Sequence, residues 1–240
     1  MAIKCLILDL DDTIVDDTEN HRGAYQHILK ILNKPFTEED FKNWLEFDSF
    51  YWHDYFKGII VPDEYNKNGD TNAEYLRGMR FTTYFKEDLP YDPIEMQGLF
   101  KEGLTHRIVA LPYAVEAIKD LSDYYPIFIS TNGDSIIGKE KTTRIGIDSY
   151  IKGIFSADMT NPPAAKSDLD YYRQLQDFIQ YYKIEECLMT GDKYRDDVLI
   201  PHQAGMKTCW LHKGKEDNLV CDYQVENLKE LKKILLPKNI

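Results

Sequence analysis

The main constraint on how this chain can fold is a set of four short, largely apolar segments bounded by polar turns. They span residues 3–8, 127–130, 187–190 and 208–211. Continuous apolar runs of this length indicate strands buried on both faces, as in parallel sheets covered by helices. Helical patterns at 135–145 and 168–182 lie between them, and a further short strand is expected at 154–157. The sequence therefore predicts an α/β fold with a doubly wound parallel sheet.

The region 16–104 differs from the rest of the chain. It shows no convincing strand pattern, and its apolar residues recur at helical spacing. Residues typical of helix starts occur at Thr37, 70–72 and Pro93. We therefore expect a core built from 1–15 and 105–240, interrupted by an all-helical insertion at 16–104.

The chain is strongly acidic, which limits its partners. Its 240 residues carry a formal net charge of −12, and the sequence pI is near 5.0. Proteins that bind nucleic acid polymers or anionic membranes cluster Lys and Arg, so neither partner is expected. A small phosphorylated substrate remains compatible with this charge if a metal ion and one or two cations surround the phosphate. The oligomeric state stays open.

The cysteines and the N-terminus favour a soluble, cytoplasmic protein. The four cysteines form no CxxC pair, and most lie in apolar runs, as expected of small buried side chains in a reducing compartment. The N-terminal apolar run is too short for a signal peptide or a membrane span, because carboxylates interrupt it.

The first strand runs directly into three carboxylates, Asp9, Asp11 and Asp12. Burying such groups is costly unless they are paired or bind a metal ion. Strand alternation puts Asp9 and Asp11 on the same side at the carboxyl end of the strand, where open α/β sheets bind ligands. One carboxylate could attack phosphorus while the other exchanges a proton with the leaving oxygen. A solvated acidic turn is the alternative.

Three further groups of polar residues follow expected strand ends or precede a helix. In chain order they are Thr131, Asn132 and Gly133, then Lys166, then Asp192, Asp196 and Asp197. The first group offers a hydroxyl, an amide and turn N–H groups that can face an anion. The second is a lone cation at a loop-to-helix junction, and the third suits a hard cation with oxygen ligands. Each alone could be a turn, a solvated lysine or an acidic helix start.

In this order, the motifs resemble those of the haloacid dehalogenase (HAD) superfamily of phosphatases. The four motifs of that family, beginning with DxDx[TV] and ending with GDxxxxD, match in turn Asp9, Asp11 and Thr13; Thr131; Lys166; and Gly191, Asp192 and Asp197. The segment 203–208 looks like the AGMxT sequence that commonly follows. The resemblance implies a Rossmann-like core, with the helical insertion as the family's cap domain.

The resemblance also implies the chemistry. The chain would be a Mg²⁺-dependent phosphomonoester hydrolase that acts on a small phosphorylated metabolite through an aspartyl-phosphate. Asp9 would be the nucleophile, and Asp11 would act as acid and then as base. Mg²⁺ would be held by Asp9, Asp192 and the backbone carbonyl of Asp11.

The remaining motif residues would bind the substrate or support the site. Those expected to hold the phosphoryl group and the substrate are Thr131, Lys166, Asn132 and Gly133. Asp197 would orient Lys166 or a metal-bound water, and Asp196 is the rival for that role. Lys193, where the family commonly has a small residue, puts an extra cation near the metal.

Four other readings compete with a phosphatase. A 2-haloacid dehalogenase also uses a nucleophilic Asp but does not need Asp11, because a halide leaves without a proton. A phosphomutase would carry both acids. A phospho-accepting signalling domain usually lacks a helical insertion of this size, and a non-catalytic binding protein would not need the complete residue set.

The substrate depends on the cap in this family. Aromatic residues between Trp44 and Phe56 could form the core of a small helical bundle, or a wall on which a base stacks. The second reading predicts a 5′-nucleotidase, and the first leaves a sugar phosphate as the alternative. Other candidate cap residues are His21, Arg22, Tyr51, His53, Arg77 and Arg80.

Overall fold

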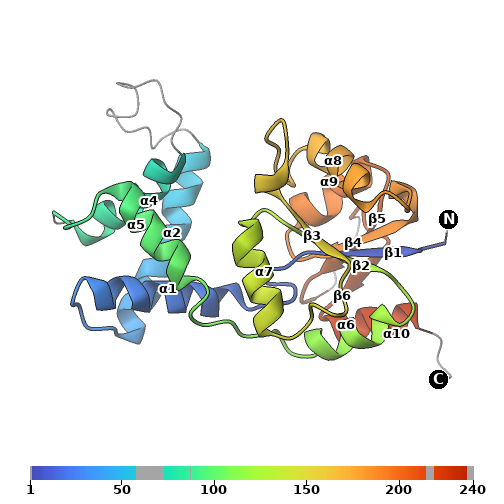
Figure 1. Cartoon of the computed structure of the whole chain (residues 1–240), viewed down its shortest axis with the longest axis horizontal. Coiled ribbons are helices and arrows are strands. Elements are labelled where there is room, and N and C mark those ends of the chain that lie inside the picture. The colour runs from blue at the N-terminus through green and yellow to red at the C-terminus, as the bar shows by residue number, and fades with distance from the viewer. Residues whose placement is uncertain (1, 58–72, 87, 215–218, 237–240) are drawn as a thin grey trace. The chain divides into compact units, whose positions relative to one another are not determined.

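The computed structural model describes residues 2–57, 73–86, 88–214 and 219–236 (Figure 1). The chain divides into two compact units. One contains Met1–Asp17 and Ile108–Ile240, and the other contains Thr18–Arg107. The domain boundaries expected from the sequence, at 15/16 and 104/105, remain a prediction.

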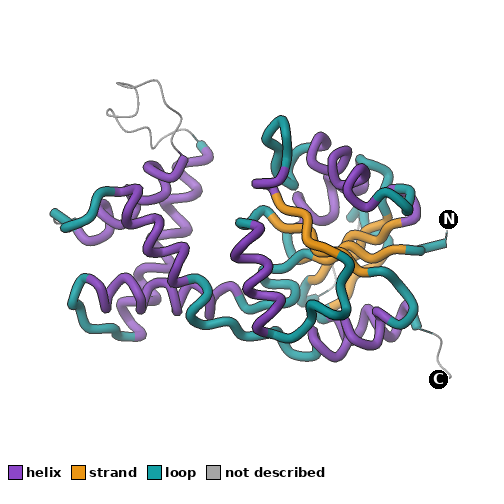
Figure 2. The backbone as a smooth tube through the Cα atoms, viewed as in Figure 1, coloured by secondary structure: helices purple, strands orange, loops and turns teal. Residues whose placement is uncertain are grey.

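The first unit is built on a six-stranded sheet, whose strands are orange in Figure 2. Every neighbouring pair of strands in it is parallel. Its strands are β1 (Cys5–Leu8), β2 (Ile127–Thr131), β3 (Gly153–Ser156), β4 (Cys187–Gly191), β5 (Lys207–Leu211) and β6 (Tyr223–Val225). Their order across the sheet is β3-β2-β1-β4-β5-β6. The predicted α/β parallel sheet is therefore confirmed, with β6 as an additional edge strand.

Helices cover both faces of this sheet. Successive side chains of a strand point to opposite faces, so a continuous apolar strand has an apolar surface to bury on each side. Leu6 and Leu8 pack with buried residues of α6 (Ala114–Ser122) and α10 (Leu228–Leu235). Cys5 and Ile7 instead pack with α8 (Leu169–Ile179). These two apolar layers give the sheet a rigid core on which residues at strand ends are held in fixed positions.

The remaining helical elements of this unit lie in the connections between β2 and β5. They are α7 (Ser135–Arg144), η1 (Ala157–Met159), η2 (Ile184–Glu186), η3 (Tyr194–Leu199) and α9 (Ile200–Gln203). The helical pattern at 168–182 yields a helix that ends at Ile179, because Gln180 adopts a positive φ of 44°.

Among its described residues, the second unit consists of helices joined by loops and contains no strand. Its helices are α1 (Asp17–Ile31, whose first residue belongs to the first unit), α2 (Glu38–Phe56), α4 (Ala73–Phe85) and α5 (Pro93–Gly103). The predicted start at Pro93 is reinforced by a capping box between Asp92 and Glu95. The helix start predicted at 70–72 lies outside the described residues.

Aromatic side chains form the centre of the helical unit. Trp44 is fully buried and stacks on Tyr25 and Phe81, at centroid distances of 5.3 and 5.0 Å. Tyr51 is also buried, and its hydroxyl donates to the carbonyl of Leu76 at 2.5 Å. The aromatic stretch in α2 therefore supplies much of the core of this unit, as the first of the two sequence interpretations expects.

Two further observations concern the whole described chain. Cys5, Cys187 and Cys209 are buried in strands as free thiols. None of the helices formed by the described residues combines the length and the apolar character needed to cross a bilayer.

Candidate active site

The strand order places one end of β1 at a topological switch point. From β1 the chain builds β2 and β3 on one side, and then crosses to form β4 on the other side. In open α/β sheets, ligands bind at the carboxyl ends of strands at such a point. Asp9 directly follows β1, Thr131 ends β2, and Asp192 directly follows β4. These three residues therefore meet at the edge where a ligand is expected.

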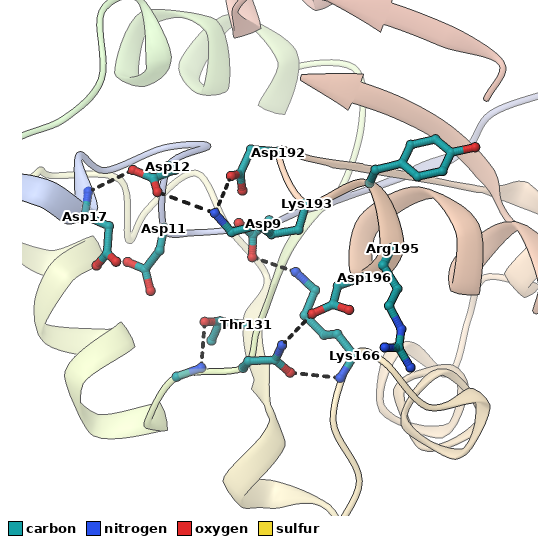
Figure 3. A pocket seen from close by; sticks show the side chains of 13 residues that line it. Asp9, Asp11, Asp12, Asp17, Thr131, Lys166, Asp192, Lys193, Arg195 and Asp196 are labelled. Carbon is teal, nitrogen blue, oxygen red and sulfur yellow. Dashed lines mark hydrogen bonds and ion pairs between the residues drawn. The ribbon is translucent and has the colours of Figure 1, made fainter. Parts of the chain in front are cut away.

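A pocket of about 440 Å³ lies at this edge (Figure 3). Its lining residues, all from the first unit, are Asp9, Asp11, Asp12, Asp17, Thr131, Asn132, Gly133, Lys166, Asp192, Lys193, Tyr194, Arg195 and Asp196. Of the catalytic, phosphate-binding and metal-binding residues predicted from the sequence, all except Asp197 line this pocket. That residue is fully buried and reaches the site through Lys166.

Asp9 is held at both carboxylate oxygens. The ammonium of Lys166 donates to Oδ1 at 2.6 Å, and the hydroxyl of Thr13 donates to Oδ2 at 3.2 Å. Lys166 also forms an ion pair with Asp197. Asp9, Lys166 and Asp197 are all buried, so these contacts replace the water that the charged groups lose.

Burial and the neighbouring charges shift the pKa values of Asp9 and Lys166. Burial raises the pKa of Asp9 well above its ordinary value, with Lys166 opposing the rise and Asp197 adding to it. For Lys166, burial lowers the pKa, but attraction to Asp197 and Asp9 outweighs that effect and raises it overall. Lys166 therefore remains a cation between the side chains of Asp9 and Asp197.

A tight turn after β1 presents the next acidic residues. The N–H of Val15 donates to the carbonyl of Leu10 at 3.0 Å, and Asp12 takes a positive φ of 57°, a conformation that Asp tolerates better than most residues. The carboxylate of Asp12 accepts a hydrogen bond from the N–H of Asp17 at 3.2 Å. This turn leaves Asp11 about a third exposed in the pocket, with its side chain at 31%.

The loop after β2 is tied to the other side of the pocket. The N–H of Gly133 donates to the hydroxyl oxygen of Thr131 at 3.0 Å. The side chain of Asn132 accepts from the N–H of Lys166 at 2.8 Å and donates to Asp196 at 3.1 Å (Figure 3). Asn132 thus links this loop to the two segments that follow β3 and β4.

In the segment after β4, the side chain of Asp197 packs directly against the backbone of Gly191. A Cβ atom at this position would lie 2.2 Å from a carboxylate oxygen of Asp197, so only glycine fits there. The same carboxylate accepts a hydrogen bond from the N–H of Lys193 at 2.9 Å. The structure therefore places Asp197 against Lys166 and Asp196 against Asn132.

The acidic residues can hold a cation. Oxygens of Asp9, Asp192 and Asp197 lie within 4.8 Å of one another. Oδ1 of Asp192 is buried without a hydrogen-bond partner among the described residues, and burial raises the pKa of this side chain, with Lys193 opposing. Within the described part of the chain, the buried ammonium that faces these three carboxylates is that of Lys166. A divalent cation with oxygen ligands would offset the remaining negative charge. The residues present fit Mg²⁺.

Lys193 is the extra cation that the sequence indicated. Its ammonium lies 2.8 Å from Oδ2 of Asp192 and 3.8 Å from Oδ2 of Asp12, and its side chain is 63% exposed. It can move away at little cost when a metal ion approaches, because exposed ion pairs contribute little.

Sequence reasoning missed other members of the site. Tyr194 and Arg195 line the pocket, and Asp17 lies beside Asp11 (Figure 3). Lys141 of α7 is buried, and its ammonium lies 2.5 Å from Oδ1 of Asp11. In the sequence, Lys141 stands in a charged run that is typical of a solvated helix face. The signal that could have identified Lys141 is its spacing of three residues from Gly138, which places both on the same face of a helix; both are buried in α7.

The cap residues proposed for substrate choice lie in the helical unit, and most of them have partners within it. Arg22 pairs with Glu19 and Glu38, and Arg77 pairs with Glu74. Arg80 is buried in the core of the unit. His21 packs edge-on against Phe100, and His53 lies beside the carboxylate of Asp54.

Taken together, the fold and the site define an α/β protein with an acidic pocket at the switch point of its parallel sheet, lined by residues that fit a divalent cation. Comparison with known proteins agrees with this class. A family model described as a haloacid dehalogenase-like hydrolase matches residues 3–205. The chain belongs to this family.

Individual relatives are distant but similar along their whole length. The chain is 24% identical to the pyrimidine 5′-nucleotidase YjjG of Escherichia coli, over 96% of each protein. It is 25% identical to the glyceraldehyde 3-phosphate phosphatase of Pyrococcus abyssi, over 99% of this chain and 95% of that protein.

Solved structures share the fold. The crystal structure of the HAD-type protein YfnB from Bacillus subtilis, bound to magnesium, superimposes with a TM-score of 0.82 at 23% identity and covers 100% of both chains. A 2-haloacid dehalogenase from Pseudomonas syringae is similar with a TM-score of 0.64 at 21% identity, over 97% of this chain and 98% of that one. Both phosphatases and dehalogenases therefore occur among the similar proteins.

Proposed function

We propose that this hydrolase is a Mg²⁺-dependent phosphomonoesterase that works through a phosphorylated Asp9. The observation that carries the proposal is the pairing of two carboxylates with different surroundings. Asp9 is buried and held at both oxygens, whereas Asp11 lines the same pocket and is partly exposed. A fixed nucleophile beside an accessible proton donor suits phosphoryl transfer to a carboxylate.

In the first step, an oxygen of Asp9 attacks phosphorus, and the bond from phosphorus to the leaving oxygen breaks. Asp11, in its protonated form, gives a proton to that oxygen, so the product leaves as an alcohol. Lys166 and the N–H groups of the loop at 131–133 stabilise the negative charge on the phosphoryl oxygens, as preorganised donors do in other acyl and phosphoryl transfers.

In the second step, water attacks the phosphorus of the aspartyl-phosphate. Asp11, now ionised, takes the proton from this water, and the bond between phosphorus and the oxygen of Asp9 breaks. Inorganic phosphate leaves, and both carboxylates return to their starting states. Asp197 keeps Lys166 in place during both steps through their buried ion pair.

The metal ion fits the oxygens of Asp9 and Asp192, with the backbone carbonyl of Asp11 as a further proposed ligand. When bound, Mg²⁺ supplies charge neutralisation between the carboxylates and the substrate's phosphate. The structure of the similar protein YfnB was solved bound to magnesium, which supports Mg²⁺ as the identity of the ion.

Dehalogenation is the main rival, because dehalogenases share the fold. A halide needs no proton to leave, so a dehalogenase has no use for a carboxylate at Asp11. Independently of this argument, the similarity to a 5′-nucleotidase and to a glyceraldehyde 3-phosphate phosphatase favours hydrolysis of a phosphate ester. A phosphomutase would use the same two acids, and it differs only in returning the phosphoryl group to the substrate.

The relatives suggest two substrate classes, nucleoside monophosphates and small sugar phosphates. The stacking argument for nucleotides is weakened because Trp44 and Tyr51 are buried within the helical unit, although Phe50 is 70% exposed. We propose a small phosphorylated metabolite as substrate, with a nucleoside monophosphate such as UMP or dTMP as the first candidate and a triose or hexose phosphate as the second.

A phosphate-release screen tests the function. Purified protein with Mg²⁺ is given nucleoside monophosphates, sugar phosphates and small phosphorylated acids, and 2-chloropropionate is added as a dehalogenase substrate. We expect steady, multiple-turnover release of phosphate from at least one ester. Chloride release without phosphate release would identify a dehalogenase, and isomerisation of a sugar phosphate without phosphate release would identify a mutase.

A further inference from the structure

Lys141 is a buried lysine that the mechanism above does not use. It belongs to α7 and is 3% exposed. Its ammonium lies 2.5 Å from Oδ1 of Asp11 and 3.7 Å from Oδ1 of Asp17. A buried ammonium is costly unless it is paired, so these two pocket carboxylates hold the charge of Lys141 in place.

The start of α7 fixes where Lys141 points. The helix begins directly after the loop at 131–133, and Asp134 caps it by accepting hydrogen bonds from the N–H groups of Ile136 and Ile137. Gly138 and Lys141 share the buried face of the helix, and a Cβ atom on Gly138 would contact Leu10 at 3.6 Å. This face therefore packs on the turn that carries Asp11.

The two oxygens of Asp11 have different surroundings. Oδ1 accepts the hydrogen bond from Lys141. Oδ2 lies on the side of the phosphoryl-binding loop, 3.8 Å from the position that a Cβ on Gly133 would take. Within the described parts of the chain, Lys141 is the sole hydrogen-bond or ion-pair partner of this carboxylate.

We propose that Lys141 is a positioning residue for the proton-transfer step: it holds Asp11 by Oδ1, so that Oδ2 faces the leaving oxygen of the substrate. This inference rests on the function proposed above. A charge-assisted hydrogen bond of this kind restricts the rotation of a partly exposed carboxylate, which would otherwise sample several orientations.

The plain alternative is a structural ion pair that only anchors α7 to the turn at 9–17. The two roles differ in their dependence on the leaving group. A residue that aims the general acid matters when an alkoxide must be protonated, and it matters little when a stable anion such as p-nitrophenolate leaves. A structural anchor affects both substrates alike.

The test compares kcat/KM for two substrates in the same preparation, the best alkyl phosphomonoester from the screen and p-nitrophenyl phosphate. Their ratio does not depend on the folded fraction. For Lys141→Met we expect a loss of about 10²-fold with the alkyl ester and a much smaller loss with p-nitrophenyl phosphate. Lys141→Arg should recover part of the loss, because it keeps a cation that can reach Asp11.

Two further variants make the test specific. Lys139→Met removes a cation from the same helix, but Lys139 is 62% exposed and pairs with Asp148, so the substrate ratio should not change. Asp11→Asn removes the general acid that Lys141 is proposed to position. Adding Lys141→Met to this variant should therefore produce no further loss of kcat/KM with the alkyl ester.

Equal losses for the two substrates, or a full additional loss in the Asp11→Asn background, would overturn the positioning role while leaving the phosphatase assignment intact. A parent protein that releases no phosphate from any ester would refute the proposed function, and the role of Lys141 with it.

Discussion

Lys166 joins the nucleophile candidate to the segment after β4: its ammonium donates to Oδ1 of Asp9 at 2.6 Å and forms an ion pair with Asp197. All three side chains are buried. These contacts join the chain after β1, the loop before α8 and η3, so one cation holds three segments of the pocket together.

Replacing Asp9 should abolish turnover and preserve the fold. Asp9→Asn keeps the size of the side chain but removes the nucleophile, and we expect kcat to fall by roughly 10³-fold or more. Phosphate release and circular dichroism measure the two effects. Asp177→Asn, an exposed change on α8, is the matched control. Near-parental turnover by the Asp9 variant would rule out the mechanism.

Asp197 and Asp196 should differ in importance. Asp197→Asn weakens the pairing of Lys166, so we expect kcat/KM to fall by about 10–100-fold, in the range typical of residues that orient a catalytic group. Asp196 is only partly buried and contacts Asn132, so Asp196→Asn should cost less. Parallel kinetic measurements rank the two variants. The assignment of roles would have to be exchanged if Asp196→Asn were the more damaging change.

How much of this site was predictable follows from where its residues stand. Asp9, Thr131 and Asp192 come directly at the ends of apolar runs, and parallel strands bring such ends to one edge. Their meeting in one pocket is therefore a consequence of the sheet. The short edge strand β6 was not predicted, because its three residues are mostly half-buried and polar residues precede and interrupt it.

Other features depend on tertiary packing that no local pattern contains. Lys141 becomes a site residue only because α7 turns it toward Asp11, 130 positions away in the chain. Arg80 reads as a surface helix residue, yet rings from several helices surround it. Long-range pairings of this kind are fixed by the assembled fold, so sequence periodicity could not predict them.

Mg²⁺ should stabilise the protein through the acidic pocket, independently of turnover. A ligand that binds only the folded state raises the free energy of unfolding, by about 2.7 kcal/mol when present at 100 times its Kd. The parent protein is first freed of metal with EDTA, and the EDTA is then removed. We expect added MgCl₂ to raise the Tm of this metal-free protein. Asp192→Asn should lose most of this increase, whereas Asp177→Asn should keep it. An equal increase in both variants would place the binding site elsewhere.

Acid should destabilise the helical unit partly through His27. Burial lowers the pKa of His27, and the neighbouring His106 lowers it further, while Glu102 opposes the shift and Lys30 adds to it. The unfolded chain therefore takes up a proton first, at a pH near the ordinary value of about 6.5. The stabilising contribution is complete above that pH and is lost as the pH falls through it toward the lower folded-state pKa.

The difference between two proteins isolates this effect from all other titrations. The Tm of the parent minus that of His27→Gln should decrease when the pH falls from about 7.5 to about 5.5, because the variant lacks the group that protonates on unfolding. A difference that stays constant, or grows, over this range would show that His27 does not titrate as its surroundings indicate.

Arg80 should act as a structural residue of the helical unit. It is 3% exposed, and its guanidinium donates to Asp48 at 2.8 Å and to Gln97 at 3.3 Å while lying 4.4 Å from the ring centroid of Phe100. Arg80→Leu would leave the buried carboxylate of Asp48 unpaired, and removing one partner of such a pair costs about 3–5 kcal/mol.

Urea unfolding followed by tryptophan fluorescence measures this cost, since Trp44 and Trp52 both lie in the helical unit. Because the penalty comes from the unpaired charge, the double variant Arg80→Leu/Asp48→Leu should recover much of the lost stability. At a temperature where Arg80→Leu is folded, the KM for the best phosphate ester should equal that of the parent. A raised KM without a loss of stability would instead make Arg80 a substrate-recognition residue, as one reading of the sequence suggested.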